Sequence, residues 1–476
     1  MAQQKRDLPL KSEGLSEWYN KIVLQAELAD YGPARGTIIY RPYGYAIWEL
    51  VQQEMDKRIK EKGVSNAYFP LLIPESLLKK EASHIEGFSP ELAVVTIGGG
   101  EELEEKLIVR PTSETIMYDA YARWIQSWRD LPLMINQWNN VVRWEKRTNI
   151  FLRGLEFLWQ EGHTAHATHE ESSAMQRWAI DMYASVYRDY FALPGYIGWK
   201  SQSEKFAGAD SSLTYESLMP EGKALQSCTS HDLGQNFSKT FNIAFQSESG
   251  GSEFAWQTSW GFSTRAIGGL VMAHGDDGGL VLPPKLAPIQ VVIIPIRLEG
   301  DKLLQVEKIA QELKAQGVRV KLDTRENASL GSKINEWELK GVPVRLEIGG
   351  KELDAGAITA ARRDTSEKSS IPLNNVVSGV QGLLSAMQEN LLAKADAFLA
   401  ANTFSADSYD EFKKILESSR GFIRAHWCED ASCEAAIKEE TKATTRCLPI
   451  DAPEESGVCV RCGKASKHRW IFGIAY

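Results

Sequence analysis

The chain contains no apolar run long enough to cross a membrane, and its first residues are polar. A helix that spans a bilayer needs about 20 consecutive apolar residues. A secretory signal needs an apolar core behind its basic start, and the opening stretch MAQQKRDLPLKSEG has none. We therefore expect neither a membrane protein nor a secreted one, and we predict a soluble, cytoplasmic protein.

Cysteine is also scarce, and basic residues are fewer than acidic ones, 54 against 63. Only 6 of the 476 residues are cysteines, and all but Cys228 lie between 428 and 462. A secreted protein held together by disulfides would spread more cysteines along its length, so the distribution argues against that class. The net charge is -9, which argues weakly against a nucleic-acid partner. It does not exclude one, because local patches rather than totals make phosphate contacts.

Four of the cysteines form two close pairs. Cys428 and Cys433 have the spacing C-x4-C, and Cys459 and Cys462 follow after 25 residues as C-x2-C. Two pairs of thiolates brought together by folding suit tetrahedral zinc. The pairs lie far along the chain from any catalytic run, which favours a structural metal. Cys447 is a fifth candidate ligand, and a disulfide framework or idle thiols remain the alternative.

The composition, with 43% apolar and 25% charged residues, is that of a globular protein with two to four domains. Three prolines between 282 and 288 indicate a linker. A β-branched run at 289–296 predicts a buried strand, 301–315 an amphipathic helix and 318–322 an alternating strand. This alternation predicts a mixed or parallel sheet covered by helices. We expect domains at 1–283, 284–400 and 405–476.

The first block mixes helices with extended segments. Apolar spacing predicts a helix over 42–62, and a second over 114–128 with Ser113 or Thr112 as its N-cap. Residues 133–144 and 151–165 should be extended, with 145–150 as a charged hairpin loop, and Thr168-x-x-Glu171 should cap the next helix.

Arginines mark the chemistry of this block. Arg143 and Arg153 stand at the ends of the two extended segments, and Arg265 precedes a helix of small apolar residues. Guanidinium groups bind phosphate bidentately and stay charged, so the three suit a triphosphate. Taken alone, these arginines are more readily explained as part of a surface hairpin with salt bridges and as an incidental residue of a packed helix.

In combination, these features resemble the class II aminoacyl-tRNA synthetases. Arg143-x-Glu145 with Phe151 and Arg153 looks like motif 2, and Arg265 with its glycine-rich helix looks like motif 3. The helix at 42–62 followed by Asn66-Ala-Tyr-Phe-Pro70 is similar to motif 1, whose proline lies at a dimer interface.

Other stretches resemble the prolyl-tRNA synthetases in particular. They are Arg110-Pro-Thr-Ser-Glu114, the run at 157–166, Trp337-Glu-Leu-Lys-Gly-Val-Pro343 and the four-cysteine block, which marks the archaeal/eukaryotic-type branch. The resemblance covers nearly the whole chain. It implies an α+β catalytic domain with an antiparallel sheet, an α/β anticodon-binding domain and a small α/β zinc-binding C-terminal domain. It also implies a homodimer that attaches L-proline to tRNA(Pro) through a prolyl-adenylate.

The resemblance further implies the site residues. The proline pocket would consist of Thr112, Glu114, Arg143, Trp159, Glu161, His163, His231 and Ser263. Glu114 can accept a hydrogen bond from the secondary ammonium, and aromatic walls fit the ring. ATP, with Mg²⁺, would contact Arg143, Glu145, Arg153, Gln226, Thr229 and Arg265, of which Arg143 and Arg265 would be catalytic. Glu338, Arg345 and Lys351 would read the anticodon, although without the resemblance they are ordinary surface charges.

Three features imitate other sites. His163, His166 and His169 lie near Glu161, but a strand points the first two to opposite faces and the third falls in the capping box. The run at 274–277 should end a helix and order a turn, although it imitates a metal cluster. Cys228 has no evident base beside it, so we interpret it as packing.

Two further expectations concern what surrounds the site. The bacterial-type branch carries an editing insertion between motifs 2 and 3, but Arg265 follows Arg153 by only 112 positions. Misactivation of alanine without hydrolytic editing is therefore expected, since a few lost methylenes are worth only ~1–3 kcal/mol. The terminal Tyr476 would reach toward the active site, although a frayed tail is the plain alternative.

The rival functions are a synthetase for another amino acid such as threonine, a non-catalytic tRNA-binding paralogue and a zinc-containing nucleic-acid-binding protein. A threonine enzyme would place zinc ligands in its pocket, whereas these cysteines lie elsewhere. The intact arginines argue against the second rival, and the third leaves the first 280 residues unexplained.

Overall fold

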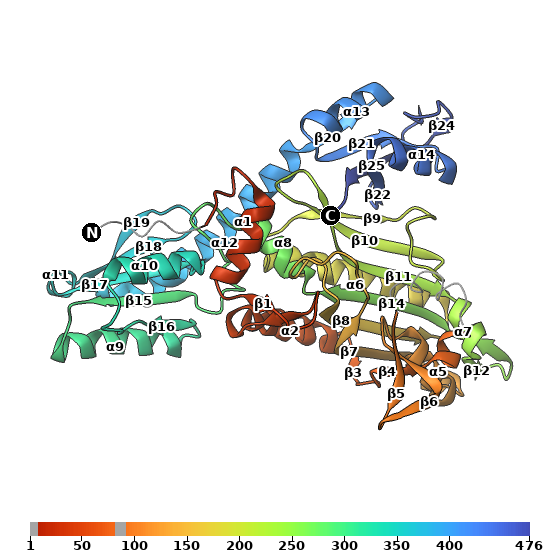
Figure 1. Ribbon diagram of the computed structural model, residues 1–476, viewed down its shortest axis with the longest axis horizontal. Helices are drawn as coiled ribbons and strands as arrows, with labels where there is room; N and C mark the ends of the chain where they lie inside the picture. The colour runs from red at the N-terminus through yellow and green to blue at the C-terminus, as the bar shows by residue number, and fades with distance from the viewer. Residues whose placement is uncertain (1–7, 81–91) are drawn as a thin grey trace.

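A sheet of 11 strands combines strands of the first block, up to β14, with strands of the C-terminal block (Figure 1). The computed structural model describes residues 8–80 and 92–476. The strand order is β20-β21-β25-β22-β9-β10-β11-β14-β8-β7-β3. Its central strands pair antiparallel and are β7 (Leu133–Val142), β8 (Glu156–His166), β9 (Gly195–Trp199), β10 (Ser211–Leu218), β11 (Ala224–Gly234) and β14 (Trp256–Ser263). The antiparallel sheet that the resemblance implies for the first block is therefore confirmed.

Strands β7 and β8 pair from Leu133 opposite Ala165 to Val142 opposite Glu156. The predicted extended segments are thus present. The second was expected to begin at 151 but begins at Glu156, so the connecting loop is longer than predicted. Inside that loop, Asn149 and Arg153 form a bridge that closes a tighter turn.

Alternation along the strands gives this sheet two different faces. Side chains at odd-numbered positions of β8 point to one face of the sheet and those at even-numbered positions to the other, because successive residues of a strand point to opposite faces. Helix α6 (His169–Asp189) covers one face, where Trp178 and Tyr183 contact Trp260. The Trp260 ring lies where Gly162 would carry a side chain, so only glycine fits there. The other face is left for the site.

Helices and small sheets surround this layer. The predicted helix at 42–62 is confirmed as α2 (Pro42–Glu61), and the helix expected over 114–128 ends early, as α5 (Glu114–Trp124). After α5 the chain forms a 3-10 turn (Trp128–Asp130), which Ser127 caps. The remaining elements are α1 (Leu15–Gln25), β1 (Ala29–Tyr31), β2 (Ile38–Tyr40), β3 (Ser65–Asn66), β4 (Leu72–Pro74), α3 (Glu75–Leu78), β5 (Ala93–Gly98), β6 (Glu101–Val109), α7 (Asn236–Phe241), β12 (Ala244–Gln246), β13 (Ser252–Phe254) and α8 (Arg265–His274).

Two predicted helix ends are confirmed. Thr168 accepts a hydrogen bond from the Glu171 amide at 3.3 Å and opens α6, while the Glu171 carboxylate accepts from the Ala167 amide. Helix α8 ends at His274, and Asp276 then forms an ion pair with Arg363. The 274–277 run therefore ends a helix, as expected.

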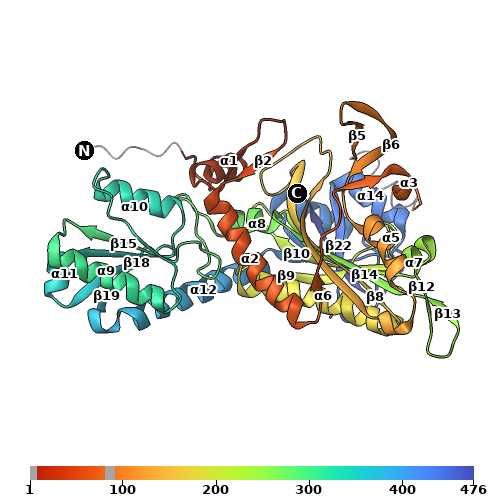
Figure 2. The ribbon, with the colours of Figure 1, turned by 90° about the horizontal axis from the view of Figure 1, so that it is seen from below.

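The middle unit, residues 289–401, stands at one end of the molecule (Figures 1 and 2). Its mixed five-stranded sheet has the order β16-β15-β17-β18-β19, parallel between β15 and its two neighbours and antiparallel beyond. This confirms the α/β prediction. The elements are β15 (Val291–Ile296), α9 (Gly300–Ala315), β16 (Val320–Leu322), α10 (Leu330–Leu339), β17 (Val344–Gly349), α11 (Gly350–Asp354), β18 (Ala357–Arg362), β19 (Lys368–Pro372) and α12 (Val376–Ala401).

The proline-rich connection into this unit is packed rather than exposed. Leu282, Leu286 and Ala287 are fully buried. The Arg319 guanidinium donates to the carbonyls of Ala287, Pro284 and Lys285. The linker predicted from three prolines is therefore a fixed joint.

The C-terminal block continues the large sheet instead of forming a separate one. Strand β22 pairs with β9, with Leu448 opposite Trp199 and Pro449 opposite Gly198. The block contains β20 (Thr403–Ala406), α13 (Tyr409–Ser418), β21 (Phe422–His426), α14 (Ala431–Thr441), β22 (Ala443–Pro449), β23 (Gly457–Val458), β24 (Ala465–Ser466) and β25 (Arg469–Ile474). Among the described residues, no helix has the length and apolar character that a membrane span requires.

Candidate active site

Three neighbouring strands build the floor of a crevice on the open face of the large sheet. Their register places His231, Ser259 and His163 side by side in one row, and Thr229, Gly261 and Glu161 in the next. The cavity above them measures about 260 Å³. It is lined by eleven of the residues expected from the sequence: Thr112, Glu114, Arg143, Trp159, Glu161, His163, Gln226, Thr229, His231, Ser263 and Arg265.

Two carboxylates and a histidine lie at the buried end of this crevice. Glu114, Glu161 and His163 have ligand atoms within 4.8 Å of one another. Glu161 accepts hydrogen bonds from His163 at 3.0 Å, from Asn139 at 2.6 Å and from Ser113. Because these donors already occupy Glu161, we interpret the cluster as an anchored polar pocket rather than a metal site.

The protonation states of this cluster follow from its contacts. Burial alone would raise the pKa of Glu161, but the hydrogen bond and charge of His163 and the other donors lower it to about 2. Burial opposes a proton on His163, yet Glu161 and Glu114 together raise its pKa. A fixed negative charge therefore lies at the end of the crevice, where a cationic amine would be stabilised.

His231 forms the opposite wall. Its Nδ1 lies 2.8 Å from the Ser212 hydroxyl, and Phe206 stacks on its ring with centroids 4.6 Å apart. Burial, together with the charges of Lys200 and His163, lowers the pKa of His231 to about 3. The ring is therefore neutral and can supply either a donor or an acceptor to a ligand.

The two arginines of the crevice contact backbone carbonyls, and one of them also contacts aromatic rings. Arg143 donates to the Pro111 carbonyl at 3.2 Å and lies over the rings of Phe157 and Trp159. Arg265 donates to the carbonyls of Leu152 at 3.1 Å and Gln226 at 3.3 Å. Burial and the charges of Arg143 and Arg153 lower the pKa of Arg265.

A second cavity adjoins the crevice and receives the third arginine. This adjoining cavity has a volume of about 370 Å³, and Gln226 and Arg265 line both spaces. Arg153 lines it, with its guanidinium 3.7 Å from Glu145. The predicted convergence of three guanidiniums is thus spread over two connected spaces. Tyr476 also lines the adjoining cavity, and its amide donates to the Ala224 carbonyl.

The other histidines are turned elsewhere. His166 contacts the Thr164 hydroxyl at 2.8 Å, and His169 contacts Asp232 at 2.6 Å. Cys228 lines the crevice, and burial raises the pKa of its thiol well above the usual range. A thiol in that state is a poor nucleophile, as the sequence interpretation supposed.

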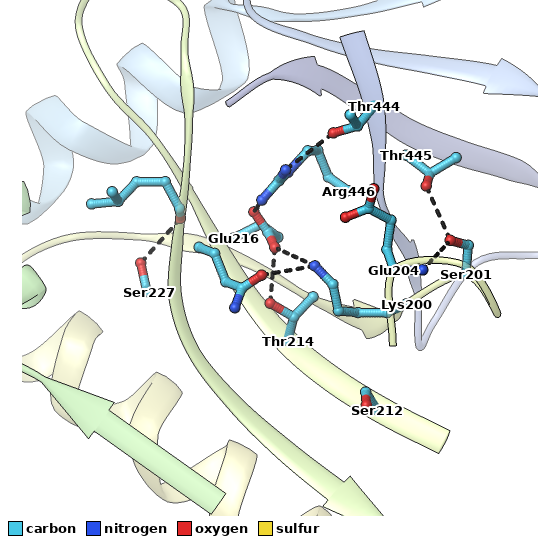
Figure 3. A network of polar contacts seen from close by, with 12 residues as sticks. Lys200, Ser201, Glu204, Ser212, Thr214, Glu216, Ser227, Thr444, Thr445 and Arg446 are labelled. Atoms are coloured by element: carbon cyan, nitrogen blue, oxygen red, sulfur yellow. Dashed lines mark hydrogen bonds and ion pairs between the residues drawn. The ribbon is translucent and has the colours of Figure 1, made fainter. Parts of the chain in front are cut away.

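Several residues of the crevice escaped the sequence analysis. Lys200, Glu204, Phe206 and Phe157 line it, and Glu216 lies buried beside it with Arg446 (Figure 3). Only Glu216 and Phe157 lie in strands, β10 and β8, whereas Lys200, Glu204 and Phe206 lie in the connection between β9 and β10, where no strand alternation marks them.

The predicted anticodon residues lie in the middle unit, in two places. Glu338 and Arg345 line a cavity of about 530 Å³, the 338–368 cavity, and are 3.1 Å apart. Lys368 lines it as well. Lys351 is placed elsewhere, on the short helix α11, and is not among the residues that line this cavity.

The four predicted cysteines meet at one point of the C-terminal block. The Cys428 and Cys462 sulfurs are 3.5 Å apart, and the Cys433 and Cys459 sulfurs are 3.6 Å apart. All four lie within 4.8 Å of one another. A disulfide would need about 2.05 Å, whereas a zinc ion bound tetrahedrally at about 2.3 Å separates its sulfurs by about 3.8 Å.

The thiols of the cluster differ in acidity, since burial and the neighbouring thiols raise the pKa of Cys428 and Cys433. Burial would raise the pKa of Cys459, but amides of Cys462, Arg461 and Cys428 donate to it and lower the pKa to about 7. Cys447, the fifth candidate ligand, lies apart from the four, buried against Gly198.

Three family models match successive parts of the chain. The tRNA synthetase class II core domain (G, H, P, S and T) matches residues 95–274, and the anticodon binding domain matches 290–383. The model described as prolyl-tRNA synthetase, C-terminal, matches 409–476.

Curated relatives match over nearly their full length. A proline--tRNA ligase of Cytophaga hutchinsonii is 50% identical over 98% of this chain and 99% of its own. One of Chlorobium luteolum is 53% identical over 98% of both chains. Proline--tRNA ligase 2 of Clostridioides difficile is 50% identical over 97% of this chain and 96% of its own.

Proposed function

Because the chain belongs to the class II prolyl-tRNA synthetases, we propose that its crevice activates L-proline with ATP and passes the prolyl group to tRNA(Pro). The observation that carries this proposal is the set of charged groups that the three strands bring into one crevice. A buried anionic end at Glu161 and Glu114 lies in one space with two arginines, Arg143 and Arg265. Such a space suits a ligand with an amine at one end and phosphates at the other.

In the proposed pose the proline ring lies between Trp159 and His231. Its ammonium donates to Glu114, and Thr112 holds that carboxylate by a hydrogen bond. The indole Nε1 of Trp159 and the hydroxyl of Ser259 have no partner within the described chain. Buried polar atoms without partners are costly, so a ligand that contacts them gains affinity.

The first step is an in-line displacement at phosphorus. A proline carboxylate oxygen attacks the α-phosphorus of ATP, and the bond to pyrophosphate breaks with its electron pair. Arg143 bridges the carboxylate and the α-phosphate, and Arg265 and Arg153 hold the remaining phosphates, with Glu145 positioning Arg153. Gln226 and Thr229 contact the adenosine and the Mg²⁺ that arrives with ATP.

In the second step the terminal ribose hydroxyl of tRNA attacks the carbonyl carbon of the prolyl-adenylate, and AMP leaves. Glu338, Arg345 and Lys351 read the anticodon from the middle unit. Tyr476 closes the adjoining cavity with its terminal carboxylate. No side chain of the protein forms a covalent bond in either step.

ATP–pyrophosphate exchange measured with each of the twenty amino acids tests this proposal. We expect exchange with proline, with alanine as the only weaker competitor, and its loss in Arg143→Ala. Equal exchange with threonine would support the rival synthetase, and no exchange at all would support the non-catalytic one.

We also propose that the four cysteines hold a structural zinc, as in the archaeal/eukaryotic-type branch. The sulfur separations and the acidic Cys459 thiol support this. Zinc analysis of the purified chain should give one ion per chain. None in the wild type, or one in a Cys459→Ser variant, would contradict it.

The chain edits nothing in cis, in our proposal. The residues between Arg153 and Arg265 form strands β8 to β14, with the helices between them and a small hairpin. Deacylation of alanyl-tRNA(Pro) by the isolated chain would contradict this.

The same proposal covers assembly, location and domain limits. Tyr68, Leu71 and Leu72 are exposed beside Pro70, and a second copy of the chain would cover them. We place the catalytic domain at 1–283, the anticodon-binding domain at 284–400 and the zinc-binding domain at 405–476. We expect the protein to work in the cytoplasm. Light scattering that gives the mass of a single chain would contradict the homodimer.

A further inference from the structure

Three buried charges beside the crevice have no part in the reaction proposed above. They are Glu216, whose side chain is fully buried, Arg446 with 6% of its side chain exposed and Lys200 with 4% (Figure 3). Lys200 and Glu216 belong to the first block, whereas Arg446 comes from strand β22 of the C-terminal block. Burying charges costs free energy unless each finds a partner, so their arrangement requires an explanation.

Glu216 divides its two oxygens between the two cations. Its Oε2 accepts from Arg446 Nε at 3.0 Å and Nη2 at 2.7 Å. Its Oε1 accepts from the Thr214 hydroxyl at 2.8 Å and lies 3.8 Å from Lys200 Nζ. Arg446 therefore satisfies one side of the carboxylate, and the other side faces the lysine.

Lys200 connects this carboxylate to the crevice. Its Nζ donates to the side-chain oxygen of Gln226 at 2.8 Å. The backbone carbonyl of the same Gln226 accepts from Arg265. One residue thus receives the lysine on its side chain and the phosphate-binding arginine on its main chain.

The backbone places these groups by two irregularities in the strands. Arg446 lies at a register shift, since its neighbours Thr445 and Cys447 pair with successive residues of β25. On β11 a second shift leaves Ser227 unpaired and sets Gln226 directly opposite Glu216. Such bulges redirect a side chain from its expected face. Here both act at the same point.

We propose that Arg446 is a positioning residue for ATP: it holds Glu216 so that Lys200 fixes Gln226, and through Gln226 fixes Arg265. Without Arg446, the buried Glu216 has Lys200 as its nearest cation, and the ammonium moves from Gln226 toward the carboxylate. The C-terminal block thereby takes part in ATP binding through one side chain. This inference rests on the proposed function for the role of Gln226 and Arg265.

The test compares the KM for ATP with the KM for proline in pyrophosphate exchange. Arg446→Met and Lys200→Met should each raise the KM for ATP about tenfold, the usual effect of losing one charge-assisted contact, and change the KM for proline less than about twofold. In the double variant the two effects should not add, because both act through Gln226. Arg469→Met is the matched control, since Arg469 lies on the neighbouring strand β25 and pairs with Asp407 and Glu455, which lie outside the strands.

Equal changes in both KM values, additive effects, or an unchanged KM for ATP in Lys200→Met would overturn the inference. If Arg446→Met does not fold, the double variant Glu216→Gln with Arg446→Met removes both buried charges. No carboxylate then draws Lys200 from Gln226, so the KM for ATP should stay near the wild-type value while Lys200→Met still raises it, and a tenfold increase in this double variant would overturn the inference. Titration calorimetry of ATP alone gives the same comparison without turnover. The proposed function is tested by pyrophosphate exchange in the wild type, whereas this inference is tested by ATP binding in the variants. The two can therefore fail separately.

Discussion

The crevice and the 338–368 cavity both contain arginines, but they hold them in opposite ways. In the crevice, Arg265 donates to two backbone carbonyls. In the 338–368 cavity, Arg345 lies 3.1 Å from Glu338 and 2.9 Å from Glu347, and Arg363 is paired with Asp276. The same side chain therefore meets neutral acceptors in one place and carboxylates in the other.

The difference separates two kinds of recognition. A guanidinium held by carbonyls keeps its full charge for a phosphate. A guanidinium beside carboxylates contributes little net field, but the pair presents donors and acceptors together, which is the pattern that a base edge requires. The crevice is thus built for a charged small ligand and the 338–368 cavity for hydrogen-bonded readout.

The largest effect should come from removing Arg265. Arg265→Met takes away a preorganised charge from the developing negative phosphorus centre, so exchange should fall by about 10²–10³-fold. Kinetics of pyrophosphate exchange at saturating proline measure this. The comparison fails if Arg345→Met lowers exchange as much.

The next largest effect should come from the sulfur cluster. Cys459→Ser removes a zinc ligand, and the proposed site contributes several kcal/mol to folding. Because β22 pairs with β9, the crevice should lose order and the middle unit should keep it. Hydrogen exchange read by mass spectrometry checks this. Equal loss of protection in residues 291–372 would contradict it.

A smaller effect is expected at the other end of the molecule. Arg345→Met should lower kcat/KM for charging of tRNA(Pro) by about 10- to 100-fold, since one base contact is worth ~1–3 kcal/mol. Pyrophosphate exchange without tRNA should stay at the wild-type rate. Lys351→Met and Lys368→Met, compared in the same assay, tell whether the lysine predicted from the sequence or the one beside Arg345 contacts the anticodon.

The smallest effect is a difference in acid sensitivity. Burial lowers the pKa of His166 to about 4 and, aided by the charges of Lys200 and His163, that of His231 to about 3, from 6.5. Below pH 6.5 the unfolded chain binds protons that the folded chain does not. Stability therefore falls as the pH is lowered, by at most about 1.4 kcal/mol per pH unit for each histidine.

The middle unit should not share this loss. Residues 289–401 contain no histidine. Salt bridges there lower the pKa of Asp323 and Glu347 against the effect of their burial, so their contribution is lost only below about pH 4.5. We expect urea unfolding, followed by hydrogen exchange between pH 6.5 and 5, to show that the crevice loses stability before the middle unit as the pH is lowered. The His166→Gln variant should have a smaller slope of stability against pH. An equal slope in both units would contradict the assignment.

The elements could be predicted because they leave local patterns, whereas most of the residues expected in the crevice came from the resemblance to the prolyl-tRNA synthetases. Alternation along β8 already places Glu161 and His163 on one face, and the cysteine spacing predicted a cluster that the structure confirms. The early end of α5 was missed, since its apolar spacing continues past Trp124 while the backbone turns away.

Contacts between distant segments could not be predicted in the same way. Arg446 and Glu216 are 230 positions apart, in a chain with 54 basic and 63 acidic residues. No local pattern selects that pair, because it depends on a bulge and on β22 joining β9. The same applies to Lys200, which in sequence is one charged residue after a short strand.

The central claim is that one crevice holds proline and the nucleotide together. Binding of a non-hydrolysable sulfamoyl analogue of prolyl-adenylate, measured by titration calorimetry, tests it directly. We expect tight binding that weakens at least about 100-fold in Arg143→Ala and for the threonyl analogue, as complementarity to the reacting complex requires. Equal affinity for the two analogues, or affinity that does not depend on Arg143, would contradict the account.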